Sequence, residues 1–318
     1  MAGQKLSADQ VSNLETIVAK NPDDLSARTE LLGYYFMRQD SSKEVREARQ
    51  KHIFWIIQNH PEAAIAGLPF CEIDPVNPFW EGSGYKRAKQ LWLEQTKAHA
   101  QNTAILGNAA QFFLIHDTDL AEDLLKQAQK AEPDNPKWSE QLGHLYALQN
   151  DKGRAAAAKS LAEFEKAQSA DTSESTRFYR LDDLAKQAFE AGEIKKASKY
   201  ANELLEAAQN NPKDWNYGNA IHDGNSVLGR IALKQGDVKK AVQYLLDAGK
   251  TPGSPQLDSF GPNMCLAKEL LEKGEKDAVL QYFMHCRKFW SMGTEKLNNW
   301  TKEVKAGKTP DFGGNLSY

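Results

Sequence analysis

Apolar residues recur every three or four positions along most of the chain, in short segments joined by polar turns. This period predicts amphipathic helices. The clearest pair of helices lies between Gly224 and Lys250, with a break at Gly236-Asp237. Its two apolar faces consist of Leu228, Gly229 and Ala232, and then of Ala241, Tyr244, Leu245 and Ala248.

Three of the predicted helix pairs share one feature, a small residue in the first helix that is followed seven residues later by glycine. The residues concerned are Ala185 and Gly192, Gly229 and Gly236, and Ala267 and Gly274. We therefore expect the three pairs to repeat one helix-turn-helix unit in a common register.

An earlier segment carries small, aromatic and proline positions at fixed intervals, namely Ala109, Phe112, Ala121, Leu125, Ala128 and Pro133. A shift of 34 residues leads from the first three to Gly143, Tyr146 and Ala155. On these residues the chain resembles the tetratricopeptide repeat family, from about Leu25 to Trp290. The resemblance implies an all-α fold, a right-handed α-α superhelix of irregular tetratricopeptide-like helix pairs. It also implies a concave groove, lined by the first helices, that holds a peptide or a partner protein.

The pattern divides the chain into three parts. Residues 1–24 are expected to form a capping helix that starts after Ser7, residues 25–290 the repeat array, and residues 291–318 a capping helix with an extended tail. A proline-rich insertion at 62–80 interrupts the array. Because it also carries Phe70, Phe79 and Trp80, we expect it to pack on the scaffold.

Composition narrows the possible partners. The 318 residues include 40 basic and 43 acidic side chains, with a net charge of −3, so nucleic acid is not an expected partner. No apolar run is long enough for a membrane span, and no export signal is visible, which makes a cytoplasmic location the default. If Met1-Ala2-Gly3 replaced a signal peptide, the protein would be periplasmic or secreted, and Cys265 and Cys286 could then pair.

Motifs for phosphate binding, for metal binding and for a catalytic nucleophile are absent from the sequence. We therefore predict no cofactor and no metal, and the pattern leaves the oligomeric state open.

Groove residues follow from the repeat register, one position after the small residue of each first helix. These are Tyr34, Ala110, His144, Lys186, Arg230 and Lys268. The last three are basic and suggest a ladder that favours an acidic ligand. Earlier positions of these helices give further groove candidates, namely Tyr179, Asp182, Asp223 and Ser226, of which the two acids would partly neutralise the ladder. The alternative is that the cations are surface groups paired with neighbouring acids. A lysine clamp for a C-terminal carboxylate is not predicted, because its positions hold Asp182, Ser226 and Met264.

A second candidate site is the polar stretch from Trp215 to Asn225, expected as a loop that leads into a groove helix. Its side chains could bind a polar ligand or act in acid and base chemistry: Trp215, Tyr217, Asn219, His222 and Asp223. The alternative is that they form turns, caps and packing contacts. Neighbours on a helix point about 100° apart, so His222 and Asp223 are not expected to form a working pair.

Two functions remain open. The first is a non-catalytic scaffold that holds a peptide or partner protein in the groove and favours an acidic segment. The second is an enzyme or small-ligand binder that uses a pocket around residues 215–225. A pocket closed by the insertion or by the C-terminal tail would favour the second.

Overall fold

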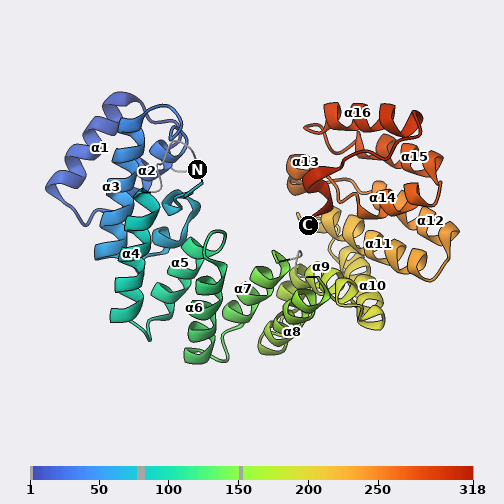
Figure 1. The fold of residues 1–318 in the computed structure, drawn as a ribbon, viewed down its shortest axis with the longest axis horizontal. Coiled ribbons are helices and arrows are strands. Elements are labelled where there is room, and N and C mark those ends of the chain that lie inside the picture. Colours follow the sequence, from blue (N-terminus) through green and yellow to red (C-terminus); the bar gives the residue numbers. More distant parts are fainter. Residues whose placement is uncertain (1–2, 77–82, 150–152, 318) are drawn as a thin grey trace. The chain divides into compact units, whose positions relative to one another are not determined.

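The computed structural model describes residues 3–76, 83–149 and 153–317. Over these ranges the chain is all-helical and contains no strand. Its contacts divide it into two compact units, Met1–Leu145 and Tyr146–Tyr318. In each unit, helices that follow one another in the chain pack side by side (Figure 1).

The N-terminal unit begins with a helix whose start agrees with the sequence prediction. Ser7 Oγ accepts a hydrogen bond from the Gln10 amide, and the Gln10 side chain accepts one from the Ser7 amide, which forms a capping box. The helices of this unit are α1 (Ala8–Lys20), α2 (Leu25–Phe36), α3 (Lys43–Asn59), α4 (Ser83–Ala98), α5 (Thr103–Phe113), α6 (Thr118–Ala131) and α7 (Pro136–Ala147), the last of which ends in the second unit.

The insertion packs on the N-terminal unit as expected, over its described residues. Two short 3₁₀ turns, η1 (Ala64–Gly67) and η2 (Pro69–Cys71), bury Ile65 and Phe70. Arg49 of α3 fixes this segment by donating hydrogen bonds of 2.7 Å to the carbonyl oxygens of Phe70 and Glu72. Burial lowers the pKa of Arg49 to about 10. Phe79 and Trp80, which were also expected to pack on the scaffold, lie outside the described residues.

The C-terminal unit stacks its helices so that each first helix also contacts the first helix of the next pair, α9 with α11 and α11 with α14. Its elements are α8 (Arg154–Ala170), α9 (Glu174–Glu190), α10 (Ile194–Asn210), α11 (Tyr217–Lys234), α12 (Val238–Gly249), α13 (Pro255–Phe260), α14 (Cys265–Glu272), α15 (Lys276–Cys286), α16 (Thr294–Lys305) and the 3₁₀ turn η4 (Gly313–Leu316).

The common register of the three glycines is confirmed by their backbone. Gly192, Gly236 and Gly274 have φ values of 80°, 84° and 87°, a region that favours glycine. In each case the next residue donates its amide to a carbonyl five residues earlier: Glu193 to Ala188, Asp237 to Ala232, and Glu275 to Leu270. This hydrogen bond closes a helix C-terminus, so the same turn occurs three times.

One position of the 34-residue shift is wrong. Gly143 and Tyr146 are buried as expected, but Ala155 is exposed. Ala155 lies nine residues before the buried Phe164 of α8, which is half a turn away around the helix. Ala156 and Ala157 take the buried position instead.

The extended C-terminal tail was also predicted incorrectly. It folds back on α15 and α16, where Phe312 is buried between the rings of Phe283 and Trp300. The indole of Trp300 donates a hydrogen bond of 3.1 Å to the Asp311 carbonyl oxygen. The tail is therefore part of the hydrophobic core of this unit.

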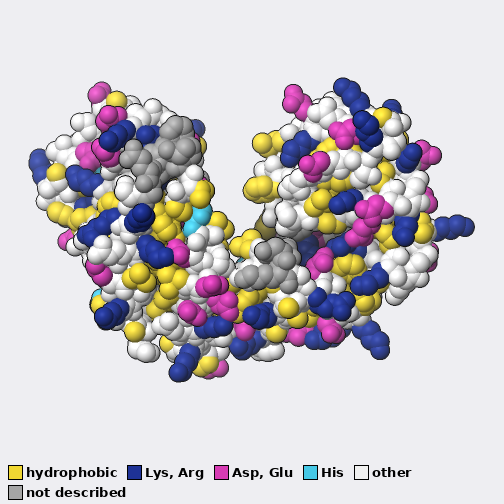
Figure 2. Space-filling view, in the orientation of Figure 1, with side chains coloured by type: hydrophobic (Ala, Val, Ile, Leu, Met, Phe, Trp, Pro, Cys, Tyr) yellow, Lys and Arg dark blue, Asp and Glu magenta, His cyan; other side chains and the backbone are white. Residues whose placement is uncertain are grey.

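Charged side chains of both signs are interspersed over the face that Figure 2 shows, in keeping with the small net charge. Among the described helices, none is both long and apolar enough to cross a membrane. The three cysteines are free thiols, and Cys71 and Cys286 are buried. The Cys265 thiol donates a hydrogen bond to the Leu316 carbonyl oxygen at 3.3 Å.

Candidate functional site

The C-terminal unit contains a cavity of about 410 Å³ between its first helices and the folded tail. Helices α9 and α11 contribute one wall, α13 and α16 another, and the 3₁₀ turn η4 closes it. Its polar and apolar lining comes from Asp182, Lys186, Asn219, Asp223, Gln256, Leu257, Phe260, Gly261, Lys296, Gly314 and Asn315.

The polar stretch from Trp215 to Asn225 is mostly helix and not the expected loop. Asn216 is the residue before α11, and every residue from Tyr217 onward is helical. Its polar groups tolerate burial because they are hydrogen-bonded: Asn225 donates to the Ile221 carbonyl oxygen, and Ser226 to that of His222. The sequence did not reveal this, because asparagine, aspartate and glycine are common in turns.

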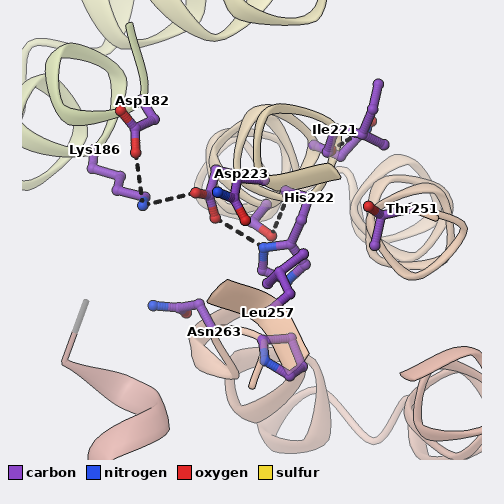
Figure 3. A network of polar contacts seen from close by, with 12 residues as sticks. Asp182, Lys186, Ile221, His222, Asp223, Thr251, Leu257 and Asn263 are labelled. Atoms are coloured by element: carbon purple, nitrogen blue, oxygen red, sulfur yellow. Dashed lines mark hydrogen bonds and ion pairs between the residues drawn. The ribbon is translucent and has the colours of Figure 1, made fainter. Parts of the chain in front are cut away.

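Lys186 connects α9 with α11 at the cavity wall. Its Nζ lies 2.9 Å from Asp223 Oδ2 and 3.5 Å from Asp182 Oδ2 (Figure 3). Burial opposes the charge of Lys186, but Asp223 and Asp182 outweigh it and raise the lysine pKa. The cation is therefore held between two carboxylates.

The two carboxylates differ in their protonation behaviour. Burial would raise the pKa of Asp223, but Lys186 and His222 outweigh burial and hold that pKa well below its usual range. Burial and the nearby Asp223 carboxylate raise the pKa of Asp182, against the opposing effect of Lys186. Asp223 thus stays ionised, while a proton binds more readily to Asp182.

His222 and Asp223 do form a pair, contrary to the expectation from helical geometry. The distance from His222 Nδ1 to Asp223 Oδ1 is 2.8 Å, because the two side chains bend toward each other although their Cβ atoms diverge. A carboxylate only accepts, so Nδ1 carries the proton. The other ring nitrogen lies 3.0 Å from the Tyr282 hydroxyl, in a fully buried position. His222 therefore supports Asp223 from behind and does not reach the cavity.

Asn219 lines the cavity but uses its amide to fix α13. Its Nδ2 donates to Asn216 and to Gln256, both at 2.9 Å, and its Oδ1 accepts from Ser254 Oγ. Ser254 also caps α13 by accepting a hydrogen bond from the Leu257 amide. The short helix with Leu257 and the exposed Phe260 is thereby held over the cavity.

Asn315 fixes the tail on the other side of the cavity. Its Nδ2 donates to the carbonyl oxygens of Phe260 and Pro262, each at 3.1 Å. The backbone carbonyl oxygen of Asn315 accepts a hydrogen bond from the Met264 amide at 2.8 Å. Lys296, on the exposed rim, lies 3.5 Å from Asn315 Oδ1.

Three other predicted site residues do not line the cavity. Tyr179 and Trp215 stack with their ring centroids 5.7 Å apart, and the Tyr179 hydroxyl donates to Asp214 at 2.8 Å. Tyr217 packs at the edge of a buried cluster that contains Phe178. These aromatic residues stabilise the contact of α9 with the start of α11.

The remaining basic candidates are dispersed. Arg230 lies between Glu269 and Glu190, with hydrogen bonds of 2.8 and 2.6 Å, above the ring of Phe189. Lys268 is half-buried on α14. His144 is exposed on α7, within the N-terminal unit. Lys186 and Arg230 are thus paired with acids, in agreement with the alternative interpretation of the ladder.

The sequence analysis missed the half of the cavity that lies outside the repeat register. Gln256, Leu257, Phe260, Lys296 and Asn315 come from the short helix, the last helix and the tail. A helical period says nothing about such residues, because loops and chain ends follow no repeat. The serine-proline pair Ser254-Pro255, a helix-start signal, is the one local hint.

In chemical terms the cavity offers a buried ion pair, a carboxyl group that readily binds a proton, amide groups and an apolar surface. Pockets that combine an apolar surface with a few polar groups are typical of sites for ligands that have both polar and apolar parts. Among the described residues, no cluster of side chains suits a metal ion. No known protein family matches the chain, and no curated protein matches it either.

Proposed function

We propose that the chain is a tetratricopeptide-like right-handed superhelix that serves as a non-catalytic scaffold and binds a segment of a peptide or partner protein. The cavity of the C-terminal unit is the place where that segment binds. The repeated helix closures at Gly192, Gly236 and Gly274 support the repeat architecture. The cavity between first helices, with Lys186 and Asp223 in its wall, is the observation that carries the binding role.

The cavity suits one or two side chains of a bound segment. Its volume of about 410 Å³ falls within the range of ligand pockets. Phe260 is 68% exposed at the rim, and Leu257 is buried beneath it. An apolar side chain on this surface would remove Phe260 from water and pack beside Leu257, while the amide groups of Gln256 and Asn315 line the same cavity.

The charges of the cavity limit the expected preference for acidic segments. Asp182 and Asp223 balance Lys186 and Lys296. Since Lys186 is held by both carboxylates, Lys296 at the rim is the cation best placed for an acidic group. We therefore propose a polar segment of low net charge, with an acidic residue, if present, near Lys296.

Selection from a displayed library of random peptides tests this function. Peptides that bind the full chain should lose about tenfold or more in affinity with Phe260→Ser, because a buried aromatic contact is lost. Met292→Ser is the matched control, since Met292 is also exposed, at 73%, but does not line the cavity. Peptides that bind both variants equally would contradict the proposed site.

A small-ligand pocket or active site is the second candidate, and one observation favours it: the tail closes the cavity through Asn315. The carboxyl groups of Asp182 and Asp223, whose pKa values are shifted in opposite directions, would suit proton transfer. A thermal-shift screen with a library of small polar metabolites distinguishes the two functions. Stabilisation by a small molecule that Asp182→Asn abolishes would favour the pocket over the peptide scaffold.

A further inference from the structure

The N-terminal unit has a second cavity, of about 420 Å³, between α2 and α3. Arg28 of α2 forms one side, and one face of α3 forms the other. That face combines the charged Glu47 and Lys51 with the aromatic Phe54 and Trp55. This cavity lies within the N-terminal unit and shares no lining residue with the cavity proposed for peptide binding, which lies in the C-terminal unit.

Arg28 is only 5% exposed, and contacts on several sides hold its side chain. Its Nε donates a hydrogen bond of 2.8 Å to the Pro22 carbonyl oxygen, and its guanidinium carbon lies 3.5 Å from the centre of the Trp55 ring. Nη1 lies 3.0 Å from His52 Nδ1. Because arginine can only donate, His52 must accept at Nδ1 and carry its proton on Nε2.

The second ring nitrogen of His52 continues this chain of contacts. His52 Nε2 lies 2.9 Å from Glu15 Oε1, which also accepts a hydrogen bond of 2.7 Å from the Tyr35 hydroxyl. Glu15 therefore contacts the imidazole nitrogen that faces away from Arg28, and it does not line the cavity. Arg28 is therefore oriented by hydrogen bonds to Pro22 and His52 and by its contact with Trp55 of the cavity wall.

One nitrogen of Arg28 is left for the cavity. Among the described residues, Nη2 has no hydrogen-bond partner, and it is not sealed from solvent. Burial lowers the pKa of Arg28, and Glu15 and Asp23 only partly oppose this, so the positive charge is incompletely compensated. Lys51 lines the same cavity and is exposed, and its charge also acts on Glu15.

We propose that this cavity binds an organic oxyanion, with its charged group between Arg28 Nη2 and Lys51 Nζ and its apolar part on Phe54 and Trp55. Of the charged residues that line the cavity, two are cations and one, Glu47, is a carboxylate, while Glu15 and Asp23, which also act on Arg28, do not line it. A guanidinium oriented in advance loses little conformational entropy when it binds an anion. The aromatic wall adds affinity for a ligand that carries an aliphatic chain.

Titration of the full chain with hexanoate, acetate and inorganic phosphate at constant ionic strength tests the site. The indole N–H resonance of Trp55, assigned with Trp55→Phe, should shift saturably with hexanoate. Hexanoate should bind at least about fivefold more tightly than acetate, because its additional methylene groups leave water. Phosphate that binds while hexanoate does not would overturn the role of the aromatic wall, and no saturable shift with any of the three would overturn the site.

Substitutions at two exposed residues of the cavity should have opposite effects on hexanoate binding, and both leave Arg28 in place. Lys51→Gln should weaken hexanoate binding about threefold or more, and Glu47→Gln should strengthen it, because one removes an attractive charge and the other a repulsive one. Lys20→Gln, an equal change of charge at the exposed end of α1, is the control and should have no effect. Affinities that are the same in both cavity variants as in the unmodified protein would overturn the proposal.

Discussion

His222 hydrogen-bonds the carboxylate of its own neighbour, with 2.8 Å between His222 Nδ1 and Asp223 Oδ1. The other carboxylate oxygen of Asp223 faces Lys186 at 2.9 Å. Asp223 therefore connects a buried imidazole with the wall of the cavity. Five measurable consequences follow from this arrangement and from other elements of the same unit.

Replacement of Asp223 by asparagine should destabilise the protein strongly. Lys186 would remain largely buried but would lose its nearer counter-ion. Removal of one member of a buried ion pair costs about 3 kcal/mol. Urea unfolding at pH 7 measures the change. Glu206→Gln, which removes an exposed carboxylate of α10, is the control and should change the free energy of unfolding by less than about 0.5 kcal/mol.

The same variant should show a defined pH dependence. The pKa of Asp223 is depressed in the folded protein, so its stabilising effect is complete above the unfolded value of about 3.9 and is lost as the pH falls toward the folded value. The difference between the unmodified protein and Asp223→Asn should therefore be constant from pH 5 to 7, roughly, and shrink below about pH 4. A difference that grows on acidification would contradict this assignment.

Asp182→Asn should have the opposite effect on stability. The pKa of Asp182 is raised by burial and by Asp223, so its ionised form is unfavourable in the folded state at neutral pH. Because its side chain is 24% exposed, we expect a gain of less than about 1 kcal/mol at pH 7, which disappears below about pH 4. Urea unfolding at both pH values measures it, and a loss of stability at pH 7 would show that the contact with Lys186 dominates.

Gly236→Ala should cost about 1 to 2 kcal/mol through the backbone alone. Its φ is 84°, and a methyl group there would meet no atom within 4 Å, so no steric clash contributes. Gly314→Ala is the control, because that position is equally open and has no positive φ. Equal midpoints of thermal unfolding for the two variants would argue against the helix closure as the reason for glycine.

Asn315→Ala should release the tail from the cavity. It removes the hydrogen bonds to Phe260 and Pro262 and leaves two carbonyl oxygens without these donors. Hydrogen exchange of the Met264 amide, which donates to the Asn315 carbonyl oxygen, should then become at least about tenfold faster, as expected for the loss of about 1.4 kcal/mol locally. Ser317→Ala, an exposed change in the same tail, should leave that exchange rate as it is.

The helices and the recurring helix closure were predictable because they depend on local periodicity and on single residues. The turn at Gly236 and the cap at Ser7 follow from the conformational preferences of single residues, which a sequence displays directly. The error at Ala155 arose because a fixed shift assumes equal loops, whereas the buried face of α8 is set by Phe164. The predicted candidates Lys186, Asn219 and Asp223 do line the cavity, although Asn219 was expected on a loop and lies on α11.

The sequence by itself determined most helices, their turns and the helix C-terminal turn that occurs at Gly192, Gly236 and Gly274. Only the tertiary structure decided which charges are paired, that His222 lies behind Asp223, and that Asn315 closes a cavity with the tail. The reason is physical: helix periodicity depends on neighbours three and four positions apart, whereas ion pairs and cavities depend on residues brought together from distant segments. Lys186 and Asp223 are 37 positions apart in the chain, and no local pattern reports their distance of 2.9 Å.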